Sequence, residues 1–374
     1  MSNTIKIIKA DIPKDKRILV TSDIHGHTEH LRQALKKANF SENDILIIIG
    51  DLIEKGPDSL GTVRYVMDLY KRGNVIVLIG NVDNWRMQMI ENISTDGADE
   101  FYNYLEFMRG WKGTSLFDEM TRELGYTVSS AEELKGCVSK VEVHFKKELD
   151  FIRGLPTILE TESFIFVHSG LPESGLEGIE ERNIYDVLGR AAFLNEDVKF
   201  EKYVVVGHYP TALYNNSYPV NNPIINKEKH IISIDGGCGL KEDGQLNVLI
   251  IPSIDCNDAD ITHIYYDIYP TVTALDGQAE STDSLKIGYL DNRIEVVSEE
   301  DELALIRHLS SGRELWIPKS YLHKGGTKCD DCTDYVLPTT SGDTLSLIRE
   351  THRGYIVKKN GISGWYFGEI EKKG

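Results

Sequence analysis

Seven short apolar runs in the first two-thirds of the chain constrain its fold more than any other feature. Each run is rich in isoleucine and valine and is continuous rather than alternating, which is typical of strands covered on both faces. Residues at helical spacing, such as Leu31, Ala34 and Leu35, separate the early runs. The runs are RILVTSD, DILIIIGD, NVIVLIGN, SFIFVHSG, KYVVVGHY, HIISIDGG and NVLIIP. This alternation of strands and helices predicts a layered α/β domain.

Polar side chains that suit metal binding follow five of these runs. They are Asp23 with His25, Asp51, Asn81, His168 and His208. In open α/β sheets, ligands bind in the crevice beyond the carboxyl ends of the strands. Any one such residue is more often a turn cap or a satisfied core histidine. Five strand ends of this kind together predict one shared site.

The types of these side chains indicate which metals the site would hold. Carboxylates, imidazoles and an amide carbonyl suit hard to borderline cations such as manganese, iron, zinc or magnesium. Asp23 and His25 are two residues apart, so an extended segment directs both to the same side. The whole set exceeds the needs of one tetrahedral ion. We therefore expect two divalent cations that share a ligand, ~3.5–4 Å apart, with manganese as the first candidate.

The same residues lie in five short blocks that resemble a known family. The blocks are SDIHG (22–26), GDLIEKGPDS (50–59), GNVD (80–83), VHSG (167–170) and VVVGHYPT (204–211). Their order and composition resemble the calcineurin-like metallophosphoesterases. The resemblance is greatest to the branch that holds bacterial serine/threonine protein phosphatases and symmetrical diadenosine-tetraphosphate hydrolases. It implies a metallophosphoesterase-type layered α/β sandwich.

The resemblance also implies a role for each ligand. Asp23 and His25 would hold the first metal, and Asp51 would bridge both metals. The second metal would be held by Asn81, His168 and His208. On physical grounds, the two cations would lower the pKa of a bridging water, and the resulting hydroxide would attack phosphorus in line.

Three further residues are expected to act in catalysis near the substrate phosphate. Lys55 stands where the family usually has arginine, and Glu54 stands where it usually has aspartate. Lysine offers a point charge but lacks the bidentate fork of arginine. Arg190, in DVLGRAAF, resembles an arginine that the family uses on substrate phosphate, with a solvated surface position as the alternative.

Val82 departs from the family pattern. The family's phosphomonoesterases carry histidine directly after the asparagine, where it protonates the leaving alkoxide, while several diesterases lack it. Because general-acid help is worth ~10²–10⁴-fold in rate, its absence should matter most for poor leaving groups. His27 and His30, just past the first block, are candidates to supply an acid instead, with a solvated loop position as the expectation for each. We expect hydrolysis of phosphodiesters or nucleotide polyphosphates. The alternatives are a serine/threonine protein phosphatase and a non-catalytic scaffold that binds phosphorylated ligands.

The chain is expected to contain two domains. Residues 1–268 would form the metallophosphoesterase domain, with a helical insertion or cap at 92–150. Trp85 and Trp111, near and within that insertion, could stack on a nucleobase, but core packing is the expectation for aromatics at helical spacing. Residues 269–374 have short alternating segments that predict a β-rich region of two small barrels.

The barrel prediction rests on GDTLSLIRETHRGYIVKKNGISGWYFGEIE, which resembles a bacterial Src-homology-3-like repeat. Such barrels are expected to bind a protein partner or to self-associate. The CDDC segment at 329–332 supplies only half of a zinc site, so we expect it to form a plain loop.

Charge and composition limit the partners. The net charge of −18 argues against binding of a nucleic-acid duplex, because most of the surface would repel a polyanion. It permits a small phosphorylated substrate or a phosphoprotein bound at a local positive site. No stretch approaches the ~18 apolar residues of a membrane span, so we expect no membrane partner and a cytoplasmic location.

Overall fold

The computed structural model describes residues 4–372, which form two compact units. The first unit runs to Tyr209 and continues with Pro223–Leu240 and Gln245–Tyr266. The second unit contains Pro210–Asn222, Lys241–Gly244 and the chain from Asp267 onward.

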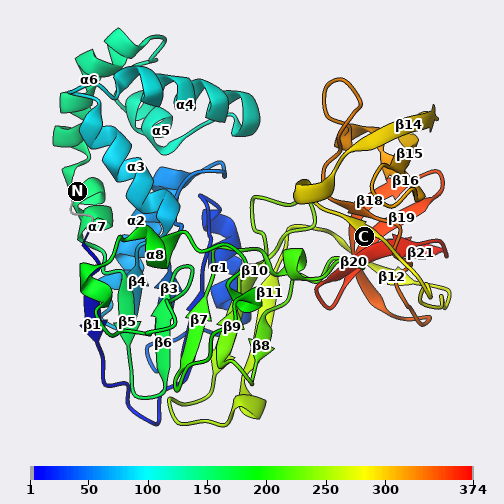
Figure 1. Ribbon diagram of the computed structural model, residues 1–374, viewed down its shortest axis with the longest axis horizontal. Coiled ribbons are helices and arrows are strands. Elements are labelled where there is room, and N and C mark those ends of the chain that lie inside the picture. Colours follow the sequence, from blue (N-terminus) through cyan, green and yellow to red (C-terminus); the bar gives the residue numbers. More distant parts are fainter. Residues whose placement is uncertain (1–3, 373–374) are drawn as a thin grey trace. The chain divides into compact units, whose positions relative to one another are not determined.

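Two β-sheets form the centre of the first unit (Figure 1). The six-stranded sheet has the order β1 (Ile7–Lys9), β5 (Ile158–Glu160), β6 (Phe164–Val167), β7 (Tyr203–Val206), β9 (Ile231–Ser233), β8 (Ile224–Asn226). The five-stranded sheet has the order β11 (Thr262–Tyr266), β10 (Leu246–Ile251), β2 (Ile18–Thr21), β3 (Ile45–Ile49), β4 (Val75–Leu78). Every one of the seven apolar runs supplies a strand to these sheets, so the predicted mixed α/β fold is confirmed.

A shared hydrophobic core joins the two sheets. Val20 and Ile47 from one sheet pack in the same cluster as Phe166 and Val205 from the other, and all four are fully buried. Burial of a side chain of this size contributes ~1.5–3 kcal/mol. Strands β2, β3 and β4 are mutually parallel, and so are β6, β7 and β9. In each sheet, the carboxyl ends of these strands therefore meet at one edge.

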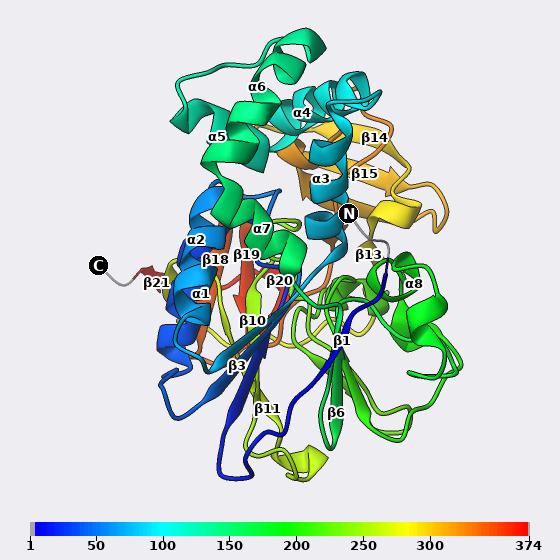
Figure 2. The same cartoon turned by 90° about the vertical axis from the view of Figure 1, so that its left-hand side faces the viewer.

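Helices cover the five-stranded sheet. Helix α1 (Thr28–Lys37) contacts β10 and β11, and α2 (Ser59–Tyr70) contacts β4. Figure 2 shows both helices along the outer face of this sheet. Asp58 caps α2 by accepting a hydrogen bond from the Gly61 amide, which satisfies one of the free donors at the start of the helix.

Five helices fill the chain between β4 and β5. They are α3 (Asn81–Asn92), α4 (Ala98–Lys112), α5 (Leu116–Glu123), α6 (Ala131–His144) and α7 (Lys146–Gly154). Helices α3 to α6 lie beyond the carboxyl ends of β3 and β4 (Figure 1). Trp85 and Trp111 are exposed on α3 and α4, so the expectation that they pack in the core is wrong. Helical spacing alone does not show which face of a helix turns inward.

The short helices complete the fold. They are η1 (Ile179–Glu181), α8 (Tyr185–Leu188), η2 (Phe193–Asn195), η3 (Thr211–Tyr214), η4 (Asp258–Asp260), η5 (Tyr289–Asp291) and η6 (Lys319–Tyr321). Within residues 4–372, no helix combines the length and the apolar character that crossing a membrane requires. The cytoplasmic location stays a prediction.

Small antiparallel sheets make up most of the second unit. One has the order β20 (Ile362–Tyr366), β19 (Gly354–Lys359), β18 (Thr344–Thr351), β12 (Thr271–Ala274), β21 (Ile370–Lys372). The other two are β14 (Ile294–Glu299), β15 (Leu303–His308), β16 (Glu314–Pro318), and β13 (Lys286–Ile287) with β17 (Cys332–Thr333). The alternating sequence pattern predicted a region of this kind.

Two details of the second unit differ from expectation. The CDDC segment ends in β17, and Cys329 and Cys332 are buried with their sulfur atoms 3.8 Å apart, so it is not a plain loop. Residues 210–222 belong to this unit although they precede it in the sequence. Lys286 Nζ holds them there by donating to the carbonyls of Ala212 and Asn215. These contacts link residues about 70 positions apart, and no local pattern indicates them.

Candidate metal centre

The turns after the strands place the proposed ligands in an uncommon backbone conformation. Left-handed φ angles occur at Asp23, His25, Asp51, Glu54, Lys55 and His208. Such strain costs ~1–3 kcal/mol per residue and persists only where the surroundings hold it. Here the Asp23 amide donates to the Gly50 carbonyl at 3.0 Å, and the His25 amide donates to the Asp51 carbonyl at 2.9 Å. The turns after β2 and β3 therefore fix each other.

One group of ligand atoms lies at the ends of β2 and β3. His25 Nε2 is 3.8 Å from Asp23 Oδ1 and 3.6 Å from Asp51 Oδ2. These separations are too long for hydrogen bonds. They suit atoms that share a cation, because each would lie ~2.0–2.2 Å from it. One ligand atom from each of the three residues falls within a 4.8 Å cluster, and all three side chains are buried.

A second group lies at the ends of β4, β6 and β7. Asn81 Oδ1 is 2.8 Å from His168 Nε2 and 2.9 Å from His208 Nδ1. His168 Nε2 is also 3.5 Å from Asp51 Oδ1. Asp51 therefore faces the first group with Oδ2 and the second group with Oδ1. A carboxylate placed in this way presents a different oxygen to each group.

Backbone carbonyls fix the orientation of two of the imidazoles. His168 Nδ1 lies 2.9 Å from the Ile49 carbonyl, and His25 Nδ1 lies 3.2 Å from the Ile53 carbonyl. A carbonyl can only accept, so Nδ1 must carry the proton in both rings. In the neutral form, Nε2 is then unprotonated in both rings, and a protonated Nδ1 bonded to a carbonyl is the usual arrangement of a metal-binding histidine.

The electrostatics of the site favour neutral imidazoles at His25 and His208 beside an ionised Asp51. At His168, by contrast, burial is outweighed by the nearby carboxylates, which raise the pKa. Burial, followed by the charge of Lys55, lowers the pKa of His25 to about 3. Burial and the neighbouring His168 lower the pKa of His208 to about 3. Burial opposes ionisation of Asp51, but the surrounding imidazoles and Lys55 outweigh it and lower its pKa to about 2. Neutral imidazole and carboxylate are the forms that bind metal.

Sequence reasoning missed two buried carboxylates at the site. Asp235 follows the last apolar residue of the run HIISIDGG, so the pattern that indicated the other candidate ligands is present there too. Burial and then the charge of Asp23 raise its pKa well above the usual range. Asp83, in the GNVD block, accepts hydrogen bonds from the Leu52 amide (2.9 Å) and the Gly80 amide (3.0 Å). It thereby holds the turn after β3 against the start of α3.

The donor set fits divalent cations. Asp23, Asp51, Asp83 and Asp235 are all buried at one edge of the sandwich. Burying several carboxylates together is costly unless a positive charge compensates them. Lys55, whose Nζ is 3.2 Å from His25 Nε2, contributes one such charge. Divalent cations between the carboxylates and imidazoles would supply the rest.

The structure places the other expected residues differently. Glu54 is fully buried, and its Oε1 accepts from Arg86 Nε at 2.7 Å, so it faces the helices. The Arg190 guanidinium pairs with the Glu196 carboxylate, while the Arg190 amide donates to Ser169 Oγ at 2.9 Å. Of the two basic residues expected to act in catalysis, Lys55 therefore places its charge beside a candidate ligand, His25, and Arg190 does not.

A comparison with family models decides the classification. Residues 16–235, well over half of the chain, match the model of the calcineurin-like phosphoesterases. The chain belongs to this family. The resemblance seen in the five sequence blocks is thereby confirmed.

Relatives of this calcineurin-like phosphoesterase include symmetrical bis(5'-nucleosyl)-tetraphosphatases. Identity is 43% over 87 residues with the enzyme of Buchnera aphidicola, covering 23% of the chain and 31% of the relative. It is 32% over 138 residues with that of Photorhabdus laumondii, covering 33% of the chain and 50% of the relative. The chain thus spans about a third to a half of the length of these relatives.

The solved structures that the chain resembles include a protein serine/threonine phosphatase from Saccharomyces cerevisiae. It is 11% identical, covers 71% of the chain and 84% of its own, and has a TM-score of 0.41.

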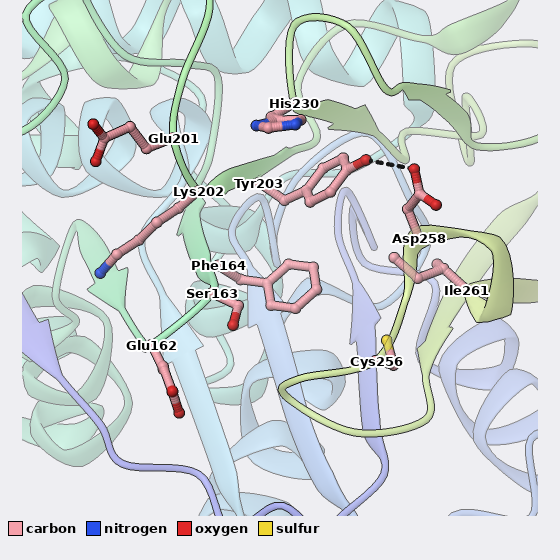
Figure 3. Close-up of a pocket in the computed structure, with 10 residues that line it drawn as sticks. All are labelled: Glu162, Ser163, Phe164, Glu201, Lys202, Tyr203, His230, Cys256, Asp258 and Ile261. Atoms are coloured by element: carbon pink, nitrogen blue, oxygen red, sulfur yellow. Dashed lines mark hydrogen bonds between the residues drawn. The ribbon is translucent and has the colours of Figure 1, made fainter.

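A cavity of about 320 Å³ lies at the opposite ends of the same strands. Figure 3 shows Phe164, Tyr203 and His230 at this cavity, with the Tyr203 hydroxyl bonded to Asp258. Phe164 and Tyr203 begin β6 and β7, whereas His168 and His208 follow the ends of these strands. Four residues of strand span ~13 Å, so this cavity is separate from the metal centre.

Proposed function

We propose that this calcineurin-like phosphoesterase hydrolyses nucleotide polyphosphates or other phosphodiesters with two divalent cations, manganese first, at the strand-end site. The observation that carries the proposal is Asp51, whose two carboxylate oxygens face two different groups of ligands. Bound cations would neutralise phosphate charge and lower the pKa of water enough to supply the nucleophile.

Two sets of side chains would bind the two cations. Asp23 and His25 would hold one cation, and Asp51 would be shared. The other cation would be held by Asn81, His168 and His208. The Nδ1–H bonds of His25 and His168 to backbone carbonyls keep both rings aimed at the site before substrate arrives.

Lys55 is the proposed phosphate contact. Its side chain is half-buried, and its Nζ reaches within 3.2 Å of His25 Nε2, so its ammonium group can donate to a phosphate oxygen beside the ligands. Arg190 is proposed as a second contact. Its guanidinium would first have to leave the Glu196 carboxylate, so we rank it below Lys55.

Val82 supports the preference for phosphodiesters and polyphosphates. It is 7% exposed in the first turn of α3, and its amide donates to Asp51 Oδ1 at 2.9 Å. An aliphatic side chain at this position cannot protonate a leaving group. His27 is a poor replacement, because burial lowers the pKa of its imidazole and thereby disfavours the protonated form that would donate. A nucleoside phosphate leaves without such help more readily than an alkoxide does.

Introducing an acid at this position tests the preference. We expect Val82→His to raise kcat/KM for an alkyl phosphate by about 10²-fold, the lower end of the range for acid catalysis, and to change an aryl diester less. The lower end applies because Glu54, the carboxylate that motif position offers to orient the imidazole, is already bonded to Arg86.

The matched control is Val82→Asn, which adds a polar group of similar size that cannot act as an acid. Equal gains on alkyl and aryl substrates, or equal gains in both variants, would show that this position does not select the substrate.

A substrate panel with manganese separates the candidate functions. We expect turnover of diadenosine tetraphosphate and an aryl diester, and loss of both with chelator. Faster turnover of a phosphoserine peptide would instead support the protein phosphatase alternative. Binding of these compounds without any turnover would support the scaffold alternative.

The second unit is proposed to bind a partner rather than to take part in hydrolysis. We propose that its small antiparallel sheets are Src-homology-3-like barrels that bind a protein or self-associate. The neighbouring exposed side chains of Tyr289 and Leu290 support such a surface. Measuring the mass of the protein in solution tests self-association.

A further inference from the structure

A row of aromatic side chains lies on α3 and α4, apart from the metal ligands. It consists of Trp85, Tyr104, Phe107 and Trp111, here called the aromatic row. Successive ring centroids are 5.2, 6.5 and 5.7 Å apart, so the rings form one continuous series. Trp85 is 40%, Phe107 60% and Trp111 46% exposed. A contiguous exposed apolar surface of this kind marks a binding site rather than a core.

One end of the aromatic row begins close to the metal centre. Trp85 follows Asn81 by four residues on the same helix, which is ~6 Å along the axis. The Arg86 guanidinium lies 3.8 Å from the centre of the Tyr104 ring and bonds Glu54, the residue before Lys55. The row is therefore anchored to the turn that carries the proposed phosphate contact.

The other end meets a second loop of the site. Lys112 Nζ lies 4.6 Å from the Trp111 ring and donates to the Gly239 carbonyl at 2.7 Å. Gly239 in turn packs against His27, since a Cβ at this glycine would lie 2.4 Å from His27 Cε1. His27 is two residues from the ligand His25. One end of the aromatic row is thus fixed to the turn after Asp51, and the other end to a loop that packs beside the turn of His25.

The exposed aromatic faces of the row indicate which kind of ligand would bind there. We propose that the aromatic row stacks on the nucleobase of a nucleoside polyphosphate whose phosphates lie at the metal centre; this rests on the proposed function. Bases stack on aromatic side chains without regard to sequence, because every base has a π-face. Lys55 beside His25 and Lys112 beside Trp111 place positive charge at the ligands and at the rings, on a chain whose net charge is −18. A phosphoserine peptide would gain nothing from the rings.

The test compares a substrate that has bases with one that has none. We expect the double variant Phe107→Leu/Trp111→Leu to lower the ratio of kcat/KM for diadenosine tetraphosphate to that for tripolyphosphate by about 5- to 150-fold. Tripolyphosphate offers the same phosphate linkage without a base. Leucine keeps the surface apolar and removes only the stacking faces. An unchanged ratio overturns the inference.

The matched control is Tyr70→Leu. Tyr70 is 51% exposed and its ring contacts Phe151 at 5.6 Å, but it is the last residue of α2, remote from the ligands. We expect this variant to keep the wild-type ratio. A loss equal to that of the double variant would assign the effect to exposed aromatics in general and overturn the inference.

A binding measurement keeps the inference separate from the proposed function. If the wild-type protein hydrolyses neither compound, the proposed function fails, and calorimetry with β,γ-methylene-ATP decides the inference. Affinity that falls 5- to 150-fold in the double variant supports stacking. Equal affinity, or no binding to the wild type, overturns it and leaves the row as a surface for a protein.

Discussion

Replacing Asp51 with asparagine should lower kcat/KM by about 10²–10³-fold and lower the metal content of the protein with it. The carboxylate places one oxygen 3.6 Å from His25 Nε2 and the other 3.5 Å from His168 Nε2. Asparagine keeps one oxygen and turns an amide donor toward the other group. It also removes the negative charge that two nearby cations would require. Metal analysis and kinetics on the same sample measure both effects.

The fold should survive this substitution. Asp51 has a φ of 53°, and asparagine is among the residues that adopt left-handed angles most readily. The control is Asp258→Asn, whose carboxylate bonds Tyr203 at the other end of the sheet and should not affect the metal content. Full activity of Asp51→Asn with its complete metal content would refute the shared-ligand assignment.

Replacing Arg86 with methionine should lower the free energy of unfolding by about 3–5 kcal/mol. Arg86 and Glu54 are both fully buried, and their Nε–Oε1 distance is 2.7 Å. Removing one partner leaves an uncompensated charge in the interior. Because Glu54 lies in the turn after β3 and Arg86 on α3, this pair ties the helix to the metal-site turn. Urea unfolding at neutral pH measures the change.

Two further variants show whether the loss comes from the buried charge. Arg64→Met breaks two pairs of a half-exposed guanidinium, with Glu123 and Glu148, and we expect it to cost no more than about 1 kcal/mol. Adding Glu54→Gln to Arg86→Met should recover part of the stability, because it removes the stranded charge. A cost for Arg86→Met as small as that for Arg64→Met would mean that the pair does not hold α3 in place.

The sequence predicted the strands and the position of the site for a definite physical reason. A continuous run of β-branched residues, such as DILIIIGD, can be buried on both faces only inside a layered structure. The polar residue that ends such a run must then lie at the edge of the sheet. Asp51 and His168 could therefore be expected to meet, although 117 positions separate them in the chain.

Pairings between distant residues could not be predicted in this way. Glu54 matched a family position for catalysis, yet its partner Arg86 lies 32 residues away on a helix whose orientation no local pattern gives. The exposure of Trp85 and Trp111 likewise depends on which face of α3 and α4 the neighbouring helices cover. Asp235 is a different case, because its position after the run HIISIDGG is visible in the sequence alone.

A manganese titration of chelator-treated protein tests the proposed metal dependence most directly. Turnover of diadenosine tetraphosphate and bound metal would be followed in the same samples. We expect no turnover without metal, a rate that rises until two equivalents are bound per chain, and no such rise with Asp51→Asn. Turnover by the metal-free protein, or two bound equivalents without turnover of any phosphoester, would contradict a dinuclear phosphoesterase.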